Sequence, residues 1–219
     1  MVAARPLADL DHPIFSESVR RIRGWLGPTG LEPLPQELLE RLVHSSGDPS
    51  LAALLRFSPG ACERGVRVLA AGAPILTDTA MAAAAVAPMA TRTFANPVHS
   101  ILSWAPPQAP PGSTRSAAGL ERALAACPGA VLLIGSAPTA LERLLDLVQQ
   151  QHQPPPPLVI GMPVGFVGVL ESKRRLAASG LPQIRLEGSR GGAGLVAAAA
   201  NALLRRAWLD QAARREPEV

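Results

Sequence analysis

The chain has few aromatic residues and few cysteines. Phe, Trp and Tyr together make up 3% of the 219 residues, and Tyr is absent, so the aromatic platforms on which proteins stack nucleic-acid bases are scarce. The basic residues are spread along the sequence rather than gathered in a run. Both observations argue against a nucleic-acid-binding protein. The two cysteines, Cys62 and Cys127, lack CxxC or histidine spacing, which favours a cytoplasmic protein with reduced thiols.

Long hydrophobic runs and the common catalytic signatures are also missing. The longest apolar run, residues 80–90, is too short to cross a bilayer, and the first residues lack a basic region followed by an apolar stretch. We therefore expect neither a membrane anchor nor a secretion signal. The sequence contains no GxxxxGKS/T, no GxSxG and no HExxH, and no GxGxxG in a first βαβ unit. We expect no nucleotide cofactor, no metal ion and no serine-hydrolase site.

Hydrophobic residues make up 47% of the chain, and they are mainly Ala, Leu and Val, a composition typical of helices packed on a sheet. Short apolar runs alternate with stretches in which leucines recur at helical spacing. This alternation predicts right-handed βαβ units, and so an α/β fold whose parallel sheet has helices on both faces. We expect a single domain over residues 1–219, with its core at about 10–208 and a polar tail at 209–219. The expected strands are residues 73–77, 130–134, 158–160 and 183–186.

Turns rich in Gly and Pro follow three of these strands, at residues 135–139, 161–168 and 188–194. Because the C-terminal ends of parallel strands share one edge of a sheet, we expect these turns to surround one ligand crevice. Their backbone N–H groups and the net charge of +4 suit a small polyanion such as a polycarboxylate. The alternative is that they are ordinary connecting turns. Thr79, after the first expected strand, caps the next helix, faces the ligand, or does both.

His44 is the strongest catalytic candidate among the four histidines. It falls at the C-terminal end of a helix expected to begin at Pro35, next to the polar stretch 45–49. An imidazole gives or takes a proton near neutral pH, and a helix C-terminus favours its protonated form, which suits a general acid. The alternative is a capping or surface histidine. Arg41, one turn earlier on the same helix face, either holds a carboxylate or is a solvated surface charge.

Several longer motifs occur together, and with them the chain resembles the precorrin-8X methylmutase family over about residues 10–205. The motifs are HPI at 12–14, FSPGA at 57–61, GAPILTD at 72–78, TRSAA at 114–118, GSAPTAL at 135–141, GMPVGFVG at 161–168 and ESK at 171–173. The resemblance implies an isomerase of cobalamin biosynthesis that moves a methyl group from C-11 to C-12 of precorrin-8X or cobalt-precorrin-8, giving hydrogenobyrinate or cobyrinate. It also implies a flavodoxin-like three-layer α/β/α fold, a homodimer, a tetrapyrrole (corrinoid) substrate and no cofactor.

The resemblance also suggests roles for individual residues. His44, preceded by Arg41 in an Arg-x-x-His pattern, matches the family's proton donor or acceptor, and Ser18 matches its substrate-contacting serine in the first helix. Two positions depart from the family pattern, Ser136 where Asn is usual and Ala193 where Ser is usual. The residues expected to bind the substrate are Ser18, Arg41, Thr79, Met81, Arg115, Ser116, Thr139, Pro163, Val164, Gly165 and Phe166.

Two other functions would use the same crevice. A corrinoid carrier would bind the ring without turnover, and a nucleotide-binding protein would place phosphates at the same strand ends. The missing nucleotide motifs disfavour the second of these.

Overall fold

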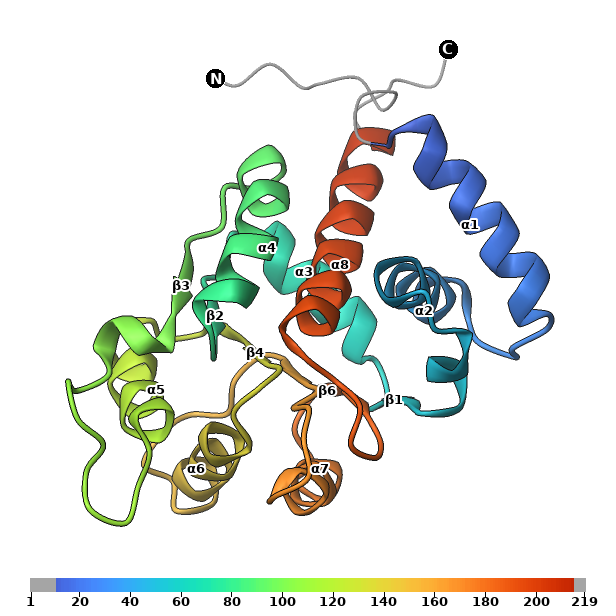
Figure 1. Ribbon diagram of the computed structural model, residues 1–219. Helices are drawn as coiled ribbons and strands as arrows, with labels where there is room; N and C mark the ends of the chain where they lie inside the picture. Colours follow the sequence, from blue (N-terminus) through green and yellow to red (C-terminus); the bar gives the residue numbers. More distant parts are fainter. Residues whose placement is uncertain (1–10, 215–219) are drawn as a thin grey trace.

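The computed structural model describes residues 11–214 of the chain, and a six-stranded sheet lies at its centre (Figure 1). The strands are β1 (Leu55–Phe57), β2 (Ile75–Thr77), β3 (Val98–Ser100), β4 (Val131–Ile134), β5 (Val159–Gly161) and β6 (Gln183–Leu186). Their order in the sheet is β1-β6-β5-β4-β2-β3, and every neighbouring pair is parallel except β1 with β6. The parallel strands therefore deliver their C-terminal ends to one edge.

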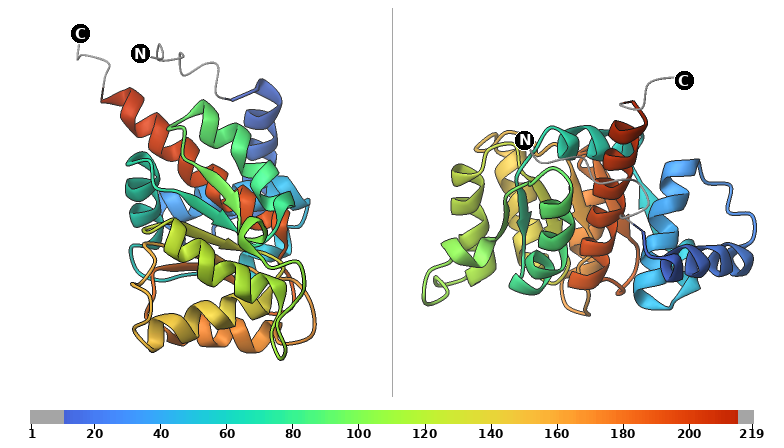
Figure 2. Two further views of the ribbon diagram at one scale, coloured as in Figure 1. Left: turned by 90° about the vertical axis from the view of Figure 1, so that its left-hand side faces the viewer. Right: turned by 90° about the horizontal axis from the view of Figure 1, so that it is seen from above.

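Helices cover both faces of this sheet (Figures 1 and 2). One face carries α3 (Ala61–Ala70), α4 (Ala80–Arg92) and α8 (Ala193–Ala213), and the other carries α5 (Arg115–Ala126), α6 (Pro138–Gln149) and α7 (Val169–Ala178). Beyond the sheet, α2 (Pro33–Ser46) packs against α8, and α1 (Pro13–Leu26) packs against α2. Two 3-10 turns, η2 (Pro49–Ala53) and η3 (Ile101–Trp104), complete the elements of the described chain. The predicted three-layer α/β/α fold is confirmed.

The central strands are continuous apolar runs because both of their faces are buried. In β4, Val131 and Leu133 belong to the core that contains residues of α3, α4 and α8, whereas Leu132 and Ile134 belong to the core under α5, α6 and α7. Successive side chains of a strand point to opposite faces, so one four-residue strand supplies both cores. This arrangement separates the two helical layers while the sheet holds the turns at its edge.

The structure contains all four predicted strands and adds two that the sequence analysis does not predict. Both additional strands, β1 and β3, are three residues long and lie at the edges of the sheet, and β1 is the antiparallel one. The last helix, α8, continues to Ala213, so residues 209–213, which we expected in the polar tail, are helical. Arg206 pairs with Asp210 one turn later, and such a pair supports the added turn.

Candidate active site

The three Gly/Pro turns meet at the C-terminal edge of the sheet, as predicted. The Val164 N–H donates to the Gly135 carbonyl (3.0 Å), and the Gly192 N–H donates to the Met162 carbonyl (2.9 Å). A Cβ atom added at Gly191 would lie 1.9 Å from the Met162 oxygen. The glycines are therefore required by the close approach of one turn's backbone to another. The turns form one rigid wall in which backbone contacts backbone.

Several backbone N–H groups of these turns are used within the protein, which corrects the expectation that they present themselves to an anionic ligand. At the start of α6, the N–H groups of Ser136 and Ala137 donate to Asp78 Oδ2, at 2.5 and 2.7 Å. Asp78 follows β2 and is 1% exposed. Burial raises the pKa of this carboxyl, and the N–H donors oppose that rise. The carboxylate that occupies the α6 N-terminus is thus the protein's own.

Asp78 is a residue beside these turns to which the sequence analysis assigns no role. The cap expected at Thr79 is present, because its Oγ1 accepts from the Ala82 N–H (3.2 Å) at the start of α4. Asp78 instead reaches across to α6. The sequence does carry a signal for this role. Asp78 directly follows a buried strand, and since Thr79 already caps the next helix, the Asp78 carboxylate is left to accept hydrogen bonds elsewhere.

Large apolar side chains are exposed beside this edge. Val164, Phe166 and Val167, in the turn after β5, are 47%, 89% and 88% exposed, and Met81, in the first turn of α4, is 71% exposed. Pro163 is buried and Gly165 half-buried. In a chain with 3% aromatic residues, an almost fully exposed Phe is unusual. Exposed apolar groups gathered in one region indicate a surface that binds an apolar face of a ligand or of another protein.

His44 lies in the last turn of α2, which ends at Gly47 in the left-handed conformation. Its Nδ1 lies 2.8 Å from Ser18 Oγ of α1, and the Phe15 ring meets the imidazole edge to face, with centroids 5.1 Å apart. Burial, together with the positive charge of Arg41, lowers the pKa of His44. This shift is opposite in direction to the one expected from the helix C-terminus. Because Nδ1 faces Ser18, Nε2 is the ring nitrogen available to a ligand.

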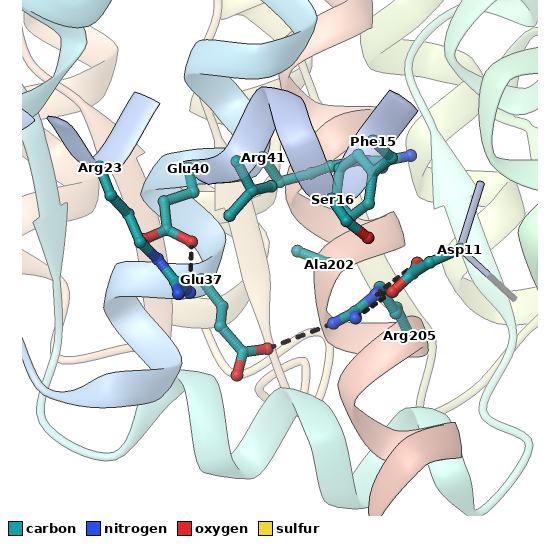
Figure 3. A pocket seen from close by; sticks show the side chains of 10 residues that line it. Asp11, Phe15, Ser16, Arg23, Glu37, Glu40, Arg41, Ala202 and Arg205 are labelled. Carbon is teal, nitrogen blue, oxygen red and sulfur yellow. Dashed lines mark hydrogen bonds and ion pairs between the residues drawn. The ribbon is translucent and has the colours of Figure 1, made fainter. Parts of the chain in front are cut away.

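Arg41 borders a cavity of about 240 Å³ that lies between α1, α2 and α8 (Figure 3). Two other arginines of this cavity are paired, Arg23 with Glu40 (2.7 Å) and Arg205 with Asp11 (2.8 Å). The Nε atom of Arg41 is buried and has no hydrogen-bond partner among residues 11–214. Burial lowers the pKa of Arg41, which means that its positive charge is poorly solvated. A carboxylate from a ligand would satisfy this donor and this charge.

The remaining predicted residues lie at the N-termini of α5 and α6. Thr114 Oγ1 is 2.8 Å from Thr139 Oγ1, which ties the first turns of the two helices together. Arg115 is exposed and uses its Nε to hold the Pro106 carbonyl (2.9 Å). Ser116 follows it and is half-buried. The predicted residues thus form one group around His44 and another around these helix N-termini, with the exposed turn after β5 as a third group.

Arg190 connects the His44 group to the wall of turns. It stands in the turn after β6, and its Nη1 lies 2.5 Å from Asp48 Oδ2 and also donates to Ser50 Oγ. Asp48 and Ser50 follow the end of α2, where His44 is located. The C-terminal end of α2 is therefore held at the same edge of the sheet as the Gly/Pro turns.

Other reactive groups lie apart from this arrangement. Cys62 is buried, and its burial raises the pKa of the thiol to about 12, so the thiol is not an activated nucleophile. Within the part of the chain that the structure describes, no group of three or more His, Cys, Asp or Glu side chains is placed to hold a metal ion. Between residues 11 and 214 no helix is long and apolar enough to cross a membrane.

The fold and the site define an α/β protein whose Gly/Pro turns meet at the carboxyl edge of its parallel sheet, with the His44 end of α2 tied to that edge through Arg190 and Asp48. The chain belongs to the precorrin-8X methylmutase family, whose model matches residues 13–206. It is 41% identical to a precorrin-8X methylmutase of Pseudomonas aeruginosa over 87% of this chain and 93% of that protein. It is 38% identical to a cobalt-precorrin-8 methylmutase of Synechocystis, over 92% of this chain and 98% of the relative.

Solved structures agree with these sequence comparisons. The structure of a precorrin-8X methyl mutase from Thermus thermophilus superimposes with a TM-score of 0.82 at 40% sequence identity, and covers 91% of this chain and 99% of its own. The family suggested by the sequence motifs is therefore confirmed over the whole fold.

Proposed function

We propose that this chain is an isomerase of cobalamin biosynthesis that moves a methyl group from C-11 to C-12 of precorrin-8X or cobalt-precorrin-8. The product is hydrogenobyrinate or, from the cobalt-containing substrate, cobyrinate. The observation that carries the proposal is the pairing of His44 Nδ1 with Ser18 Oγ (2.8 Å) in a chain of this family, which also exposes a group of apolar side chains after β5. The pair supplies proton chemistry, and the apolar surface suits a large conjugated ring.

The proposed reaction is a rearrangement within one molecule. The bond between the methyl carbon and C-11 breaks as the bond to C-12 forms, so the substrate and the product are isomers, and atoms and electrons balance without an external methyl donor. The protein has to hold the ring in the reactive geometry and to move one proton.

His44 is the residue to which we assign the proton. Its pKa is lowered in the free protein by burial and by Arg41, and the carboxylates of a bound corrinoid would oppose that effect, because nearby negative charge favours the protonated imidazole. His44 gains a proton as the substrate binds and donates it from Nε2 to the conjugated ring, which eases the electron redistribution that accompanies migration. The proton returns to Nε2 as the product forms. Throughout, the Ser18 hydroxyl fixes the orientation of the His44 imidazole through its contact with Nδ1.

The substrate contacts follow from the chemistry of the three groups of residues. We assign the faces of the corrinoid ring to the apolar residues Met81, Pro163, Val164, Gly165 and Phe166. We assign its acetate and propionate groups to the polar residues Arg41, Thr79, Arg115, Ser116 and Thr139. Arg41 supports this assignment because its buried Nε is without a partner in residues 11–214, and a guanidinium is the group best suited to a carboxylate.

We also propose that the chain works as a single-domain homodimer in the cytoplasm. The support is the exposure of Val167, at 88%, since a second copy packed against this side chain would remove it from water. Light scattering at micromolar concentration is expected to give twice the mass of the chain. A monomer at that concentration would overturn the dimer.

The test of the function is turnover by the purified protein of precorrin-8X and, in a parallel assay, of cobalt-precorrin-8, followed by the change in corrinoid absorbance. We expect many equivalents of product. Product limited to one equivalent would instead identify a carrier. His44→Ala should lower kcat by about 10² to 10⁴ and change corrinoid affinity less. The matched control is His152→Ala, an exposed histidine after α6, at the other end of that helix from the turns.

A further inference from the structure

Lys173 is a buried cation to which the proposed mechanism gives no role. It lies on α7 and is 3% exposed, and its Nζ donates to the carbonyl oxygens of Gly188 (2.7 Å) and Arg190 (2.6 Å). Burying an ammonium group is costly, and burial lowers the pKa of Lys173 to about 8. An apolar side chain would fill the same space without that cost. What the lysine adds is a pair of directed bonds to one turn.

The turn that Lys173 holds, after β6, packs against the turn after β5 that carries the exposed apolar side chains. The Gly165 N–H donates to the Ser189 carbonyl (3.0 Å), and the Gly192 N–H donates to the Met162 carbonyl (2.9 Å). The backbone of residues 188–192 is therefore clamped between Lys173 on one side and the turn that carries Val164 and Phe166 on the other. A displacement of residues 188–190 would be transmitted to that turn.

Arg190 extends the same connection to the catalytic helix. Its carbonyl is held by Lys173, and its guanidinium reaches Asp48 (2.5 Å) and Ser50. The Asp48 N–H donates to Ser46 Oγ (3.2 Å), and Ser46 Oγ donates to the carbonyl of Leu42 in α2 (2.9 Å). A continuous series of polar contacts thus runs from α7 to the last turn of α2, where His44 lies.

We propose that Lys173 and Arg190 are positioning residues, a brace that fixes the His44 end of α2 relative to the wall of turns that faces the corrinoid. The inference rests on the proposed function. Neither residue is required to touch the substrate; each acts by holding two parts of the site at a set separation. Proton transfer depends steeply on such separations, and a displacement of about 1 Å costs up to about 10²-fold in rate.

Arg190→Met is the first test, because Arg190 and Asp48 are partly exposed, at 50% and 35% of their side chains, and exposed ion pairs contribute little to stability. We expect kcat to fall by about 10-fold or more, with KM changed by less than about threefold and the melting temperature nearly unchanged. Asp48→Asn should have the same effect, and the double variant should be no worse than either single one. Arg190→Lys should recover part of the rate.

The matched control is Arg143→Met, which breaks another exposed pair between helices, with Glu121 (2.7 Å), on the α5 and α6 side of the sheet. Its kcat should equal that of the wild type. Lys173→Met is expected to lower kcat more than Arg190→Met does, because it removes both buried hydrogen bonds that hold the backbone of the turn at Gly188 and Arg190. If kcat is unchanged in Arg190→Met and in Asp48→Asn, or if their effects add in the double variant, the brace is wrong. Absence of turnover by the wild type would overturn the proposed function instead.

Discussion

Gly191→Ala provides a sharp test of how the site is built. The added Cβ would lie 1.9 Å from the Met162 oxygen, and real Cβ atoms keep at least 3.0 Å, so the two turns must separate by about 1.1 Å. Overpacking of this kind costs about 1–3 kcal/mol, and loss of the neighbouring hydrogen bond from the Gly192 N–H to the Met162 carbonyl (2.9 Å) costs about 1 kcal/mol more. We expect the free energy of unfolding in urea to fall by about 2–4 kcal/mol.

Catalysis should fall as well in Gly191→Ala, because a wall displaced by about 1 Å misplaces the ring relative to His44, and kcat is expected to drop by up to about 10²-fold. Gly194→Ala is the matched control. Gly194 lies three residues further on, at the start of α8, and a Cβ there would meet nothing within 4 Å. That variant should be as stable as the wild type or up to about 1 kcal/mol more stable. Equal stability of the two variants would refute the close approach of the turns.

Three further outcomes are expected. Folded Lys173 has a pKa of about 8 and the unfolded residue one of about 10.4, so the unfolded chain holds an extra proton between these pH values and stability rises with pH there, by up to about 1.4 kcal/mol per unit. Urea unfolding at pH 8 and pH 10 should show this rise in the wild type relative to Lys173→Met, and parallel curves would contradict it. Asp78→Ala leaves the N–H groups of Ser136 and Ala137 without their acceptor and should lower the free energy of unfolding by about 2 kcal/mol; a loss below about 0.5 kcal/mol would mean that water replaces the carboxylate. Phe166→Ala should weaken corrinoid binding in a spectroscopic titration while leaving thermal stability unchanged, because this side chain is 89% exposed, and unchanged affinity would exclude it from the binding surface.

The elements that sequence analysis predicts well are those with a strong local pattern. The strands at 131–134 and 159–161 are apolar runs that reach a glycine, at Gly135 and Gly161, and α6, which follows the first of them, repeats leucine at helical spacing. The edge strands β1 and β3 escape prediction because neither is a continuous apolar run: Arg56 lies in the middle of β1 and His99 in the middle of β3. In addition, β1 pairs antiparallel with β6, whose paired residues lie 127 to 131 positions further along the chain. The length of α8 was underestimated because its last turns are polar and are supported by ion pairs such as Arg206 with Asp210.

By itself, the sequence determined the α/β class, the family and the edge of the sheet at which the Gly/Pro turns meet, because apolar runs, Gly/Pro breaks and long motifs are written in consecutive residues. Tertiary structure decided which groups meet there. His44 pairs with Ser18, 26 positions away, and Asp78 reaches Ser136, 58 positions away, through helix packing and strand order. Tertiary structure also decided the direction in which the pKa of His44 shifts. A helix end acts on its own residues, whereas the partial desolvation of His44 depends on how α1 packs over α2, and this desolvation, together with the charge of Arg41, lowers the pKa of His44.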